Sequence, residues 1–146
     1  MIERLTDFYA LAKRFEGCRL MPYFCPAGVL TCGWGSTGLD VIMGRLWTQE
    51  YADRRLEQDA IRFATGALAA CPALAQEPDR RLSAITDFAY NLGLGRLRGS
   101  TLRKRVNARA WGQAASELRK WVRAGGRALL GLVLRRECEA QLINGK

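Results

Sequence analysis

The sequence has no histidine, a shortage of acidic residues and no long hydrophobic run, and each lack excludes a class of function. Without histidine or a C-x-x-C pair, the usual donors of a zinc site are missing, so we predict no metal and no cofactor. The longest apolar run, residues 128–134, is seven residues long, whereas about 20 are needed to cross a bilayer. Charged residues also interrupt residues 1–15, where a signal peptide would need an apolar core. We therefore expect synthesis in the cytoplasm and no stable membrane anchor.

The five cysteines are an odd number without paired, repeating spacing. This pattern favours free thiols in a reducing compartment over a disulfide framework.

The acidic shortage leaves 23 Lys and Arg against 14 Asp and Glu, a net charge of +9. A surplus of this size attracts polyanions such as nucleic acid, an acidic membrane surface or an anionic cell wall. The net charge alone favours nucleic acid as the partner. However, the arginines are spread along every segment and do not gather on one recognition helix, so we predict no nucleic-acid partner.

The apolar pattern predicts an α+β fold that is mainly helical. Residues 5–16 carry one apolar stripe, and residues 17–42 combine glycines with β-branched and aromatic residues, as short antiparallel strands do. Further helices are expected over 48–70, 82–92, 100–106, 111–122 and 129–142.

A chain of 146 residues is the size of one domain. Within it we expect a small β-containing N-terminal lobe over about 16–60 and a connecting helix over about 48–70. A helical lobe over about 71–146, together with the N-terminal helix, completes the domain. The cleft would then lie between the lobes.

Glu16 is the candidate proton donor. It is the last acidic residue before Asp40, and it stands where the first helix gives way to a loop at Gly17. The helix dipole disfavours an acid at this end, which indicates a functional reason for the carboxyl. Such a group stays protonated near neutral pH only if burial or its neighbours favour the neutral form.

The spacing around Glu16 resembles that of a known family. Glu16 is followed after eight residues by Cys25 and after five more by Thr31, which opens T-C-G-W-G-S-T-G. Together with F-A-Y-N-L-G-L-G at 88–95, S-T-L at 100–102 and the block at 121–136, this resembles the phage-type lysozymes of glycoside hydrolase family 24.

The resemblance implies a lysozyme-like fold and a monomeric endolysin that causes host cell lysis. Its partner would be peptidoglycan, in which it hydrolyses the β-1,4 bond between N-acetylmuramic acid and N-acetylglucosamine. It also implies dependence on a holin, which would open the host membrane and release the enzyme from the host cytoplasm to the periplasmic cell wall.

By the same resemblance Glu16 is the general acid, and Cys25 and Thr31 position the attacking water. Cys25 stands where the family carries Asp or Cys. A thiol is a poor base near neutral pH unless a guanidinium such as Arg19 favours the thiolate, so a structural cysteine is the alternative. Ser36 stands where relatives often have histidine, so the contact made by that imidazole is missing or replaced.

For the substrate groove the resemblance points to five residues whose hydroxyl, amide, carboxyl and aromatic groups suit a sugar: Thr37, Tyr90, Asn91, Thr101 and Glu117. Tyr90 could equally be part of the core.

Four further residues have alternative interpretations. Trp111 and Trp121 lie on an apolar stripe, which favours a core role. Arg135 and Arg136 either contact the acid or the wall, or form a solvated basic face.

Three other functions stay open at this point. A lytic transglycosylase needs the acid but no water-activating partner, and the lack of Asp at position 25 favours it. A basic helical nucleic-acid-binding protein would bind duplexes in a salt-dependent way. In a redox-switched enzyme, Cys25 would pair with Cys18 or Cys32 and be inactive until reduced.

Overall fold

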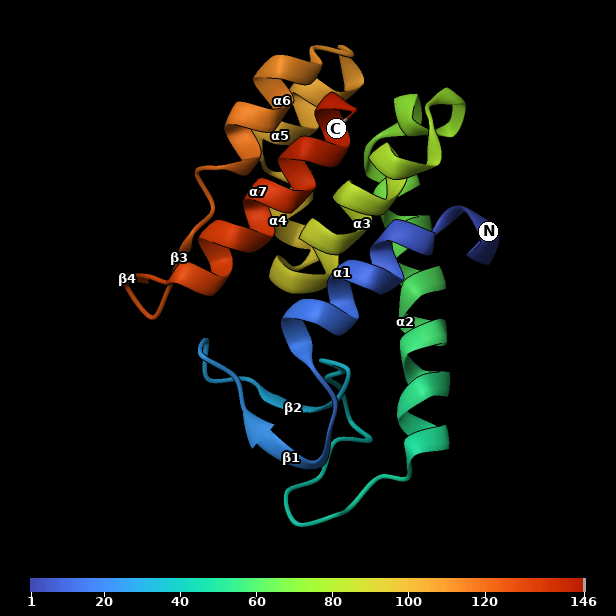
Figure 1. Ribbon diagram of the computed structural model, residues 1–146, viewed down its shortest axis with the longest axis vertical. Helices are drawn as coiled ribbons and strands as arrows, with labels where there is room; N and C mark the ends of the chain where they lie inside the picture. Colours follow the sequence, from blue (N-terminus) through green and yellow to red (C-terminus); the bar gives the residue numbers. More distant parts are fainter. Residues whose placement is uncertain (146) are drawn as a thin grey trace.

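The computed structural model describes residues 1–145 and has the mainly helical α+β architecture expected from the sequence. A two-stranded sheet lies at one end of the molecule and most helices gather at the other (Figure 1). The long helix α2 (Gln49–Ala70) runs from the sheet end into the helical end.

The N-terminal helix α1 (Thr6–Glu16) follows a short 3-10 turn, η1 (Ile2–Arg4). Its apolar stripe buries Phe8 and Ala12 in the main core. The helix ends at Glu16 because Gly17 has a φ of 65°, which favours glycine and stops the helical path. Glu16 is thus the last helical residue, directly before the sheet.

The sheet pairs β1 (Arg19–Phe24) with β2 (Leu30–Gly33) in antiparallel register, with Tyr23 opposite Thr31. Residues 25–29 form the turn between them, closed by hydrogen bonds from the Cys25 amide to the Val29 carbonyl (2.9 Å) and from the Gly28 amide to the Cys25 carbonyl (2.8 Å). A small core of Cys32, Val41, Trp47 and Ala52 lies beneath this sheet.

Helix α2 begins where the sequence indicates. The Thr48 side chain accepts a hydrogen bond from the Tyr51 amide, which caps the first turn. Gly66 in its interior has a packing reason, because a Cβ there would lie 2.5 Å from Leu94 Cδ1. The glycine therefore lets α4 (Leu94–Arg98) pack closely against α2.

The helical lobe surrounds α3 (Asp79–Leu92), which is buried without interruption from Leu82 to Ala89. Helix α3 packs against α1, α2 and α7 (Leu130–Asn144), so its side chains can contact residues of all three. The other elements of this lobe are η2 (Pro72–Gln76), α4 (Leu94–Arg98), α5 (Thr101–Asn107), α6 (Trp111–Leu118), β3 (Arg123–Ala124), β4 (Arg127–Ala128) and α7 (Leu130–Asn144).

The prediction of a helix from 111 to 122 was wrong at its C-terminal end. Helix α6 ends at Leu118, and β3 and β4 form a small hairpin that turns at Gly125-Gly126. The reason is tertiary packing: the Trp121 ring lies edge-on to Phe88, with centroids 5.5 Å apart, and its carbonyl accepts a hydrogen bond from Arg136. Trp111 and Trp121 both pack against the main core, as predicted.

Candidate active site

A cavity of about 550 Å³ lies between the sheet and the helical lobe. The β1–β2 turn and the loop after β2 line one part of it, and the end of α1, α3, the β3–β4 hairpin and the start of α7 line the other. Six of the predicted site residues meet there: Glu16, Cys25, Thr31, Thr37, Tyr90 and Asn91.

The Glu16 carboxyl is held from two sides. Arg135 Nη1 donates a 2.5 Å hydrogen bond to Glu16 Oε2. On the other side the backbone of Gly35 approaches so closely that a Cβ there would lie 2.7 Å from Glu16 Cδ. The Glu16 side chain keeps 18% of its surface exposed, so the carboxyl is fixed yet open to the cavity.

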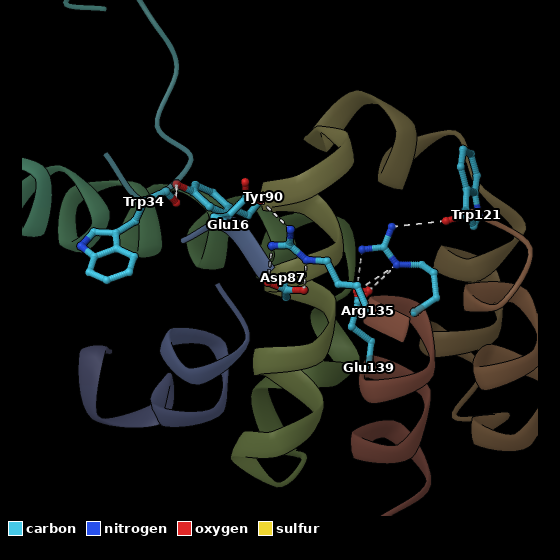
Figure 2. A network of polar contacts seen from close by, with 8 residues as sticks. Glu16, Trp34, Asp87, Tyr90, Trp121, Arg135 and Glu139 are labelled. Atoms are coloured by element: carbon cyan, nitrogen blue, oxygen red, sulfur yellow. Dashed lines mark hydrogen bonds and ion pairs between the residues drawn. The ribbon is translucent and has the colours of Figure 1, made fainter. Parts of the chain in front are cut away.

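Arg135 is fixed in turn by Asp87 on α3. Its Nε and Nη2 atoms donate two parallel hydrogen bonds of 2.8 Å to the Asp87 carboxylate (Figure 2). The Arg135 side chain is 4% exposed and that of Asp87 is 0% exposed. Burial opposes the charge of Arg135, but Asp87 and Glu16 outweigh burial and raise its pKa.

A second ion pair lies behind the first. Arg136 and Glu139 are both 0% exposed and share hydrogen bonds of 2.7 to 3.1 Å, while Arg136 Nη1 also donates to the Trp121 carbonyl (Figure 2). Burial raises the pKa of Glu139, and the Arg136 guanidinium opposes that rise. The interpretation of Arg135 and Arg136 as a solvated basic face was therefore wrong.

On the sheet side, Thr31 and Cys25 are held by local contacts. Thr31 is buried and its hydroxyl donates to the Val29 carbonyl at 2.8 Å, which leaves the hydroxyl oxygen as an acceptor. Cys25 is half-buried at the start of the turn, and all five cysteines are free thiols. The structure thus contains neither of the disulfides considered for a redox switch.

Ser36 contacts helix α2 through its side chain. Its hydroxyl donates to Asp59 Oδ2 at 2.7 Å, and Asp59 also accepts from Arg55 Nη1 at 2.6 Å. Ser36 is fully buried, while its neighbours Gly35 and Thr37 line the cavity. Its role in this structure is to join the loop after β2 to α2.

Tyr90 and Asn91 contribute the α3 side of the cavity. The Tyr90 hydroxyl donates to the Trp34 carbonyl at 2.9 Å, so it joins the two lobes, and burial raises its pKa. Its ring lies edge-on to Phe8 and Phe63, so Tyr90 is both core and cavity wall. Asn91 Oδ1 is buried and accepts no hydrogen bond from the described part of the chain.

The structure does not bring the last two predicted residues to this cavity. Thr101 is exposed at the start of α5, and Glu117 on α6 is half-buried and pairs with Lys120. Sequence reasoning, on the other hand, did not identify Asp87 or Gly35. The only signal for Asp87 was an acidic residue in the middle of a helix expected to be largely apolar.

Residues 1–145 lack two further classes of feature. They contain no group of three or more His, Cys, Asp or Glu side chains arranged to hold a metal ion. Over the same residues, no helix combines the length and the apolar character that a membrane crossing requires.

Comparisons with known proteins agree with this arrangement. The family model for phage lysozyme matches residues 13–139. The SAR-endolysin of Bacteriophage PS119 is 37% identical over 125 residues, which are 85% of this chain and 73% of that relative. The active form of P1 phage endolysin Lyz superposes with a TM-score of 0.81 at 29% identity, covering 96% of this chain and 84% of the other.

A second solved structure, the endolysin from Escherichia coli O157:H7 phage FAHEc1, has a TM-score of 0.78 at 28% identity. The superposition covers 94% of this chain and 90% of that endolysin. The matched residues run from α1 to α7 and include both walls of the cavity. This chain therefore belongs to the phage lysozyme family and is a glycoside hydrolase of that family.

Proposed function

We propose that Glu16 is the general acid with which this endolysin hydrolyses the β-1,4 bond between N-acetylmuramic acid and N-acetylglucosamine in peptidoglycan. One observation carries the proposal: the Glu16 carboxyl faces the cavity and is held by a guanidinium that is itself anchored at a buried carboxylate. A proton donor must be positioned closely against the leaving oxygen, and such double anchoring provides that position.

In this mechanism Glu16 protonates the glycosidic oxygen as the bond to the anomeric carbon breaks. Water attacks the oxocarbenium-like carbon from the opposite face of the sugar ring. Thr31 and Cys25 line the sheet side of the same cavity, where that water would stand. Because the Thr31 hydroxyl already donates to the Val29 carbonyl, its oxygen is free to accept a hydrogen bond from the water, and the proton that the water loses on attack passes to solvent.

Substrate contacts are expected from residues on both sides of the cavity. Asn91 Oδ1 is a buried acceptor that has no donor among residues 1–145, which suits the amide N–H of an N-acetyl group. Thr37 is exposed at the cavity edge and can bond a sugar hydroxyl. Tyr90 offers an apolar wall, since its hydroxyl is already bonded to Trp34. Thr101 and Glu117 stay predictions for contacts beyond this cavity.

The test compares wild type with Glu16→Gln and Cys25→Ser in a turbidity assay on permeabilised bacteria. General acid catalysis contributes roughly 10² to 10⁴ in rate, so we expect near-complete loss for Glu16→Gln. Cys25→Ser should lose substantial activity but less, because a hydroxyl keeps part of the polar contact. Circular dichroism of both variants controls for folding. Wall clearing by Glu16→Gln would overturn the assignment.

The alternative reaction is that of a lytic transglycosylase, favoured by the lack of a carboxylate at position 25. In that reaction the muramic acid's own hydroxyl replaces water. Mass spectrometry of digested peptidoglycan separates the two, since hydrolysis gives reducing ends and the transglycosylase gives 1,6-anhydromuramic ends.

We further propose that the enzyme reaches the wall through a holin. The test is expression in bacteria with and without a co-expressed holin, and lysis is expected only with it. Lysis by this chain alone would contradict holin dependence while leaving the muramidase assignment intact. The relatives named SAR-endolysin make that comparison informative.

A further inference from the structure

Arg135 lies between two carboxylates and makes more hydrogen bonds to one than to the other. It makes two parallel hydrogen bonds to Asp87 and one to Glu16. Asp87 is fully buried, whereas Glu16 keeps part of its surface open to the cavity. A buried carboxylate without a cation would carry a large desolvation penalty, so Asp87 depends on Arg135.

This arrangement matters because a general acid has to be protonated before reaction. A guanidinium beside a carboxyl favours the ionised form, and this effect is strong away from water. A lone Arg135 would therefore work against a proton donor. With Asp87 bound to the same guanidinium, the Arg135–Asp87 unit is neutral overall, and its pull on a second carboxylate is largely cancelled.

We propose that Asp87 is a positioning residue that neutralises Arg135, so that Arg135 orients Glu16 by a hydrogen bond without holding it in the carboxylate form. The inference rests on the proposed role of Glu16 as the general acid.

The other groups around Glu16 do not take over the role of Asp87 in neutralising Arg135. Tyr23 on β1 and Tyr90 on α3 face Glu16, and burial raises the pKa of both, so both are neutral at working pH. Cys25 lines the same cavity, and Arg19 packs on the ring of Tyr23, 4.3 Å from its centroid. Behind Asp87, Glu139 is paired with Arg136, which is again a neutral unit.

The experiment is a pH–activity profile of wall clearing by wild type and Asp87→Asn. The amide keeps the shape of the side chain but removes its charge, so Arg135 then acts on Glu16 alone. We expect the alkaline limb of the profile to move to lower pH by about one unit or more, with activity at the acid end within a few-fold of wild type. An unmoved limb with a uniform loss of activity would overturn the inference.

Charge-matched variants separate positioning from folding. Asp87→Glu restores the charge, and its limb should return toward wild type even if total activity falls. The double variant Asp87→Asn with Arg135→Gln is again neutral, and its limb should return as well. If Asp87→Asn does not fold, these two variants carry the test, and a limb displaced to lower pH in both would overturn the inference.

Failure of this inference is distinguishable from failure of the proposed function. If Glu16→Gln abolishes wall clearing and Asp87→Asn leaves the limb unmoved, only the role of Asp87 is wrong. If Glu16→Gln still clears walls, the acid has been misassigned, whatever the profile of Asp87→Asn.

Discussion

The two walls of the cavity hold their functional groups by different means. The helical wall consists of the end of α1, α3, the β3–β4 hairpin and the start of α7, and the sheet wall consists of the β1–β2 turn and the loop after β2. On the helical wall, Glu16 is fixed through buried charges from α3 and α7, which are far apart in sequence. On the sheet wall, Cys25 and Thr31 stand on one hairpin and are fixed by hydrogen bonds to backbone groups within residues 25–31. The proton donor is therefore positioned by the tertiary structure, and the water side by local structure.

This difference bears on which changes each wall can accept. A buried ion pair leaves an uncompensated charge when either partner is removed, so the helical wall is sensitive to single substitutions. The hairpin places its side chains through the backbone, so a side chain there can change without disturbing its neighbours. A thiol at position 25 fits this view of the sheet wall.

The sharpest test of the helical wall is the pair of variants Glu139→Gln and Arg136→Met. Glu139→Gln leaves Arg136 buried with its charge, which a guanidinium cannot lose. We expect the free energy of unfolding to fall by about 3–5 kcal/mol. Arg136→Met should lose less, because Glu139, whose pKa burial raises, can take up a proton. Denaturant unfolding measures both, and equal losses would contradict this asymmetry.

Gly35, on the loop after β2, lies directly against Glu16, and a substitution there should displace the acid. In Gly35→Ala the new Cβ would meet the Glu16 carboxyl at 2.7 Å, and φ is 94°. A displacement of the acid by about 1 Å can reduce the rate roughly 10²-fold. Gly44→Ala is the matched control, because φ is 85° there and nothing lies within 4 Å of the added carbon. Similar activity in both variants would show that Gly35 does not position Glu16.

The two walls also differ in how far the sequence could predict them. The helix end at Glu16, the glycine-rich hairpin and the capped start of α2 depend on local patterns, and the fold class was predicted correctly. The contacts of Asp87 and Arg135 join residues 48 positions apart, and those of Glu16 and Arg135 join residues 119 apart. No periodicity specifies which charges on a helix will be buried.

The same limit explains the remaining differences. Helix α6 ends early because Trp121 packs on Phe88, which lies on another helix. The contact of Ser36 with Asp59 could not be predicted, because it depends on how α2 passes the loop after β2. An Arg followed three residues later by Glu is the one local signal for the Arg136–Glu139 pair, and it does not indicate that the pair is buried.

A smaller effect is expected at Tyr90, whose hydroxyl links α3 to the Trp34 carbonyl on the loop after β2. Tyr90→Phe removes the hydrogen bond from α3 to the Trp34 carbonyl, which should lower the free energy of unfolding by about 1 kcal/mol. The matched control Tyr51→Phe removes a bond to Asp40 within the sheet end. We expect the substrate affinity to fall in Tyr90→Phe and to be unchanged in Tyr51→Phe. Binding of soluble peptidoglycan fragments measures this affinity. Equal affinities in the two variants would show that the hydrogen bond between Tyr90 and Trp34 is not needed for binding.

The smallest effect concerns the charges of the sheet end, which are less buried than those of the helical wall. Hydrogen bonding to Arg55 holds the pKa of Asp40 below its usual value near 4, so its ion pair stabilises the fold above that pH. As pH falls through the lowered pKa, Asp40 becomes protonated and this contribution is lost. Asp40→Asn should therefore be less stable than wild type at pH 7, and the difference should shrink below about pH 4. Denaturant unfolding at pH 7, 4 and 2.5 measures this, and a constant difference would mean that the charge of Asp40 contributes nothing. Because Arg55 keeps Asp59 as a second partner, the loss should be smaller than that caused by Glu139→Gln, where Arg136 keeps no carboxylate.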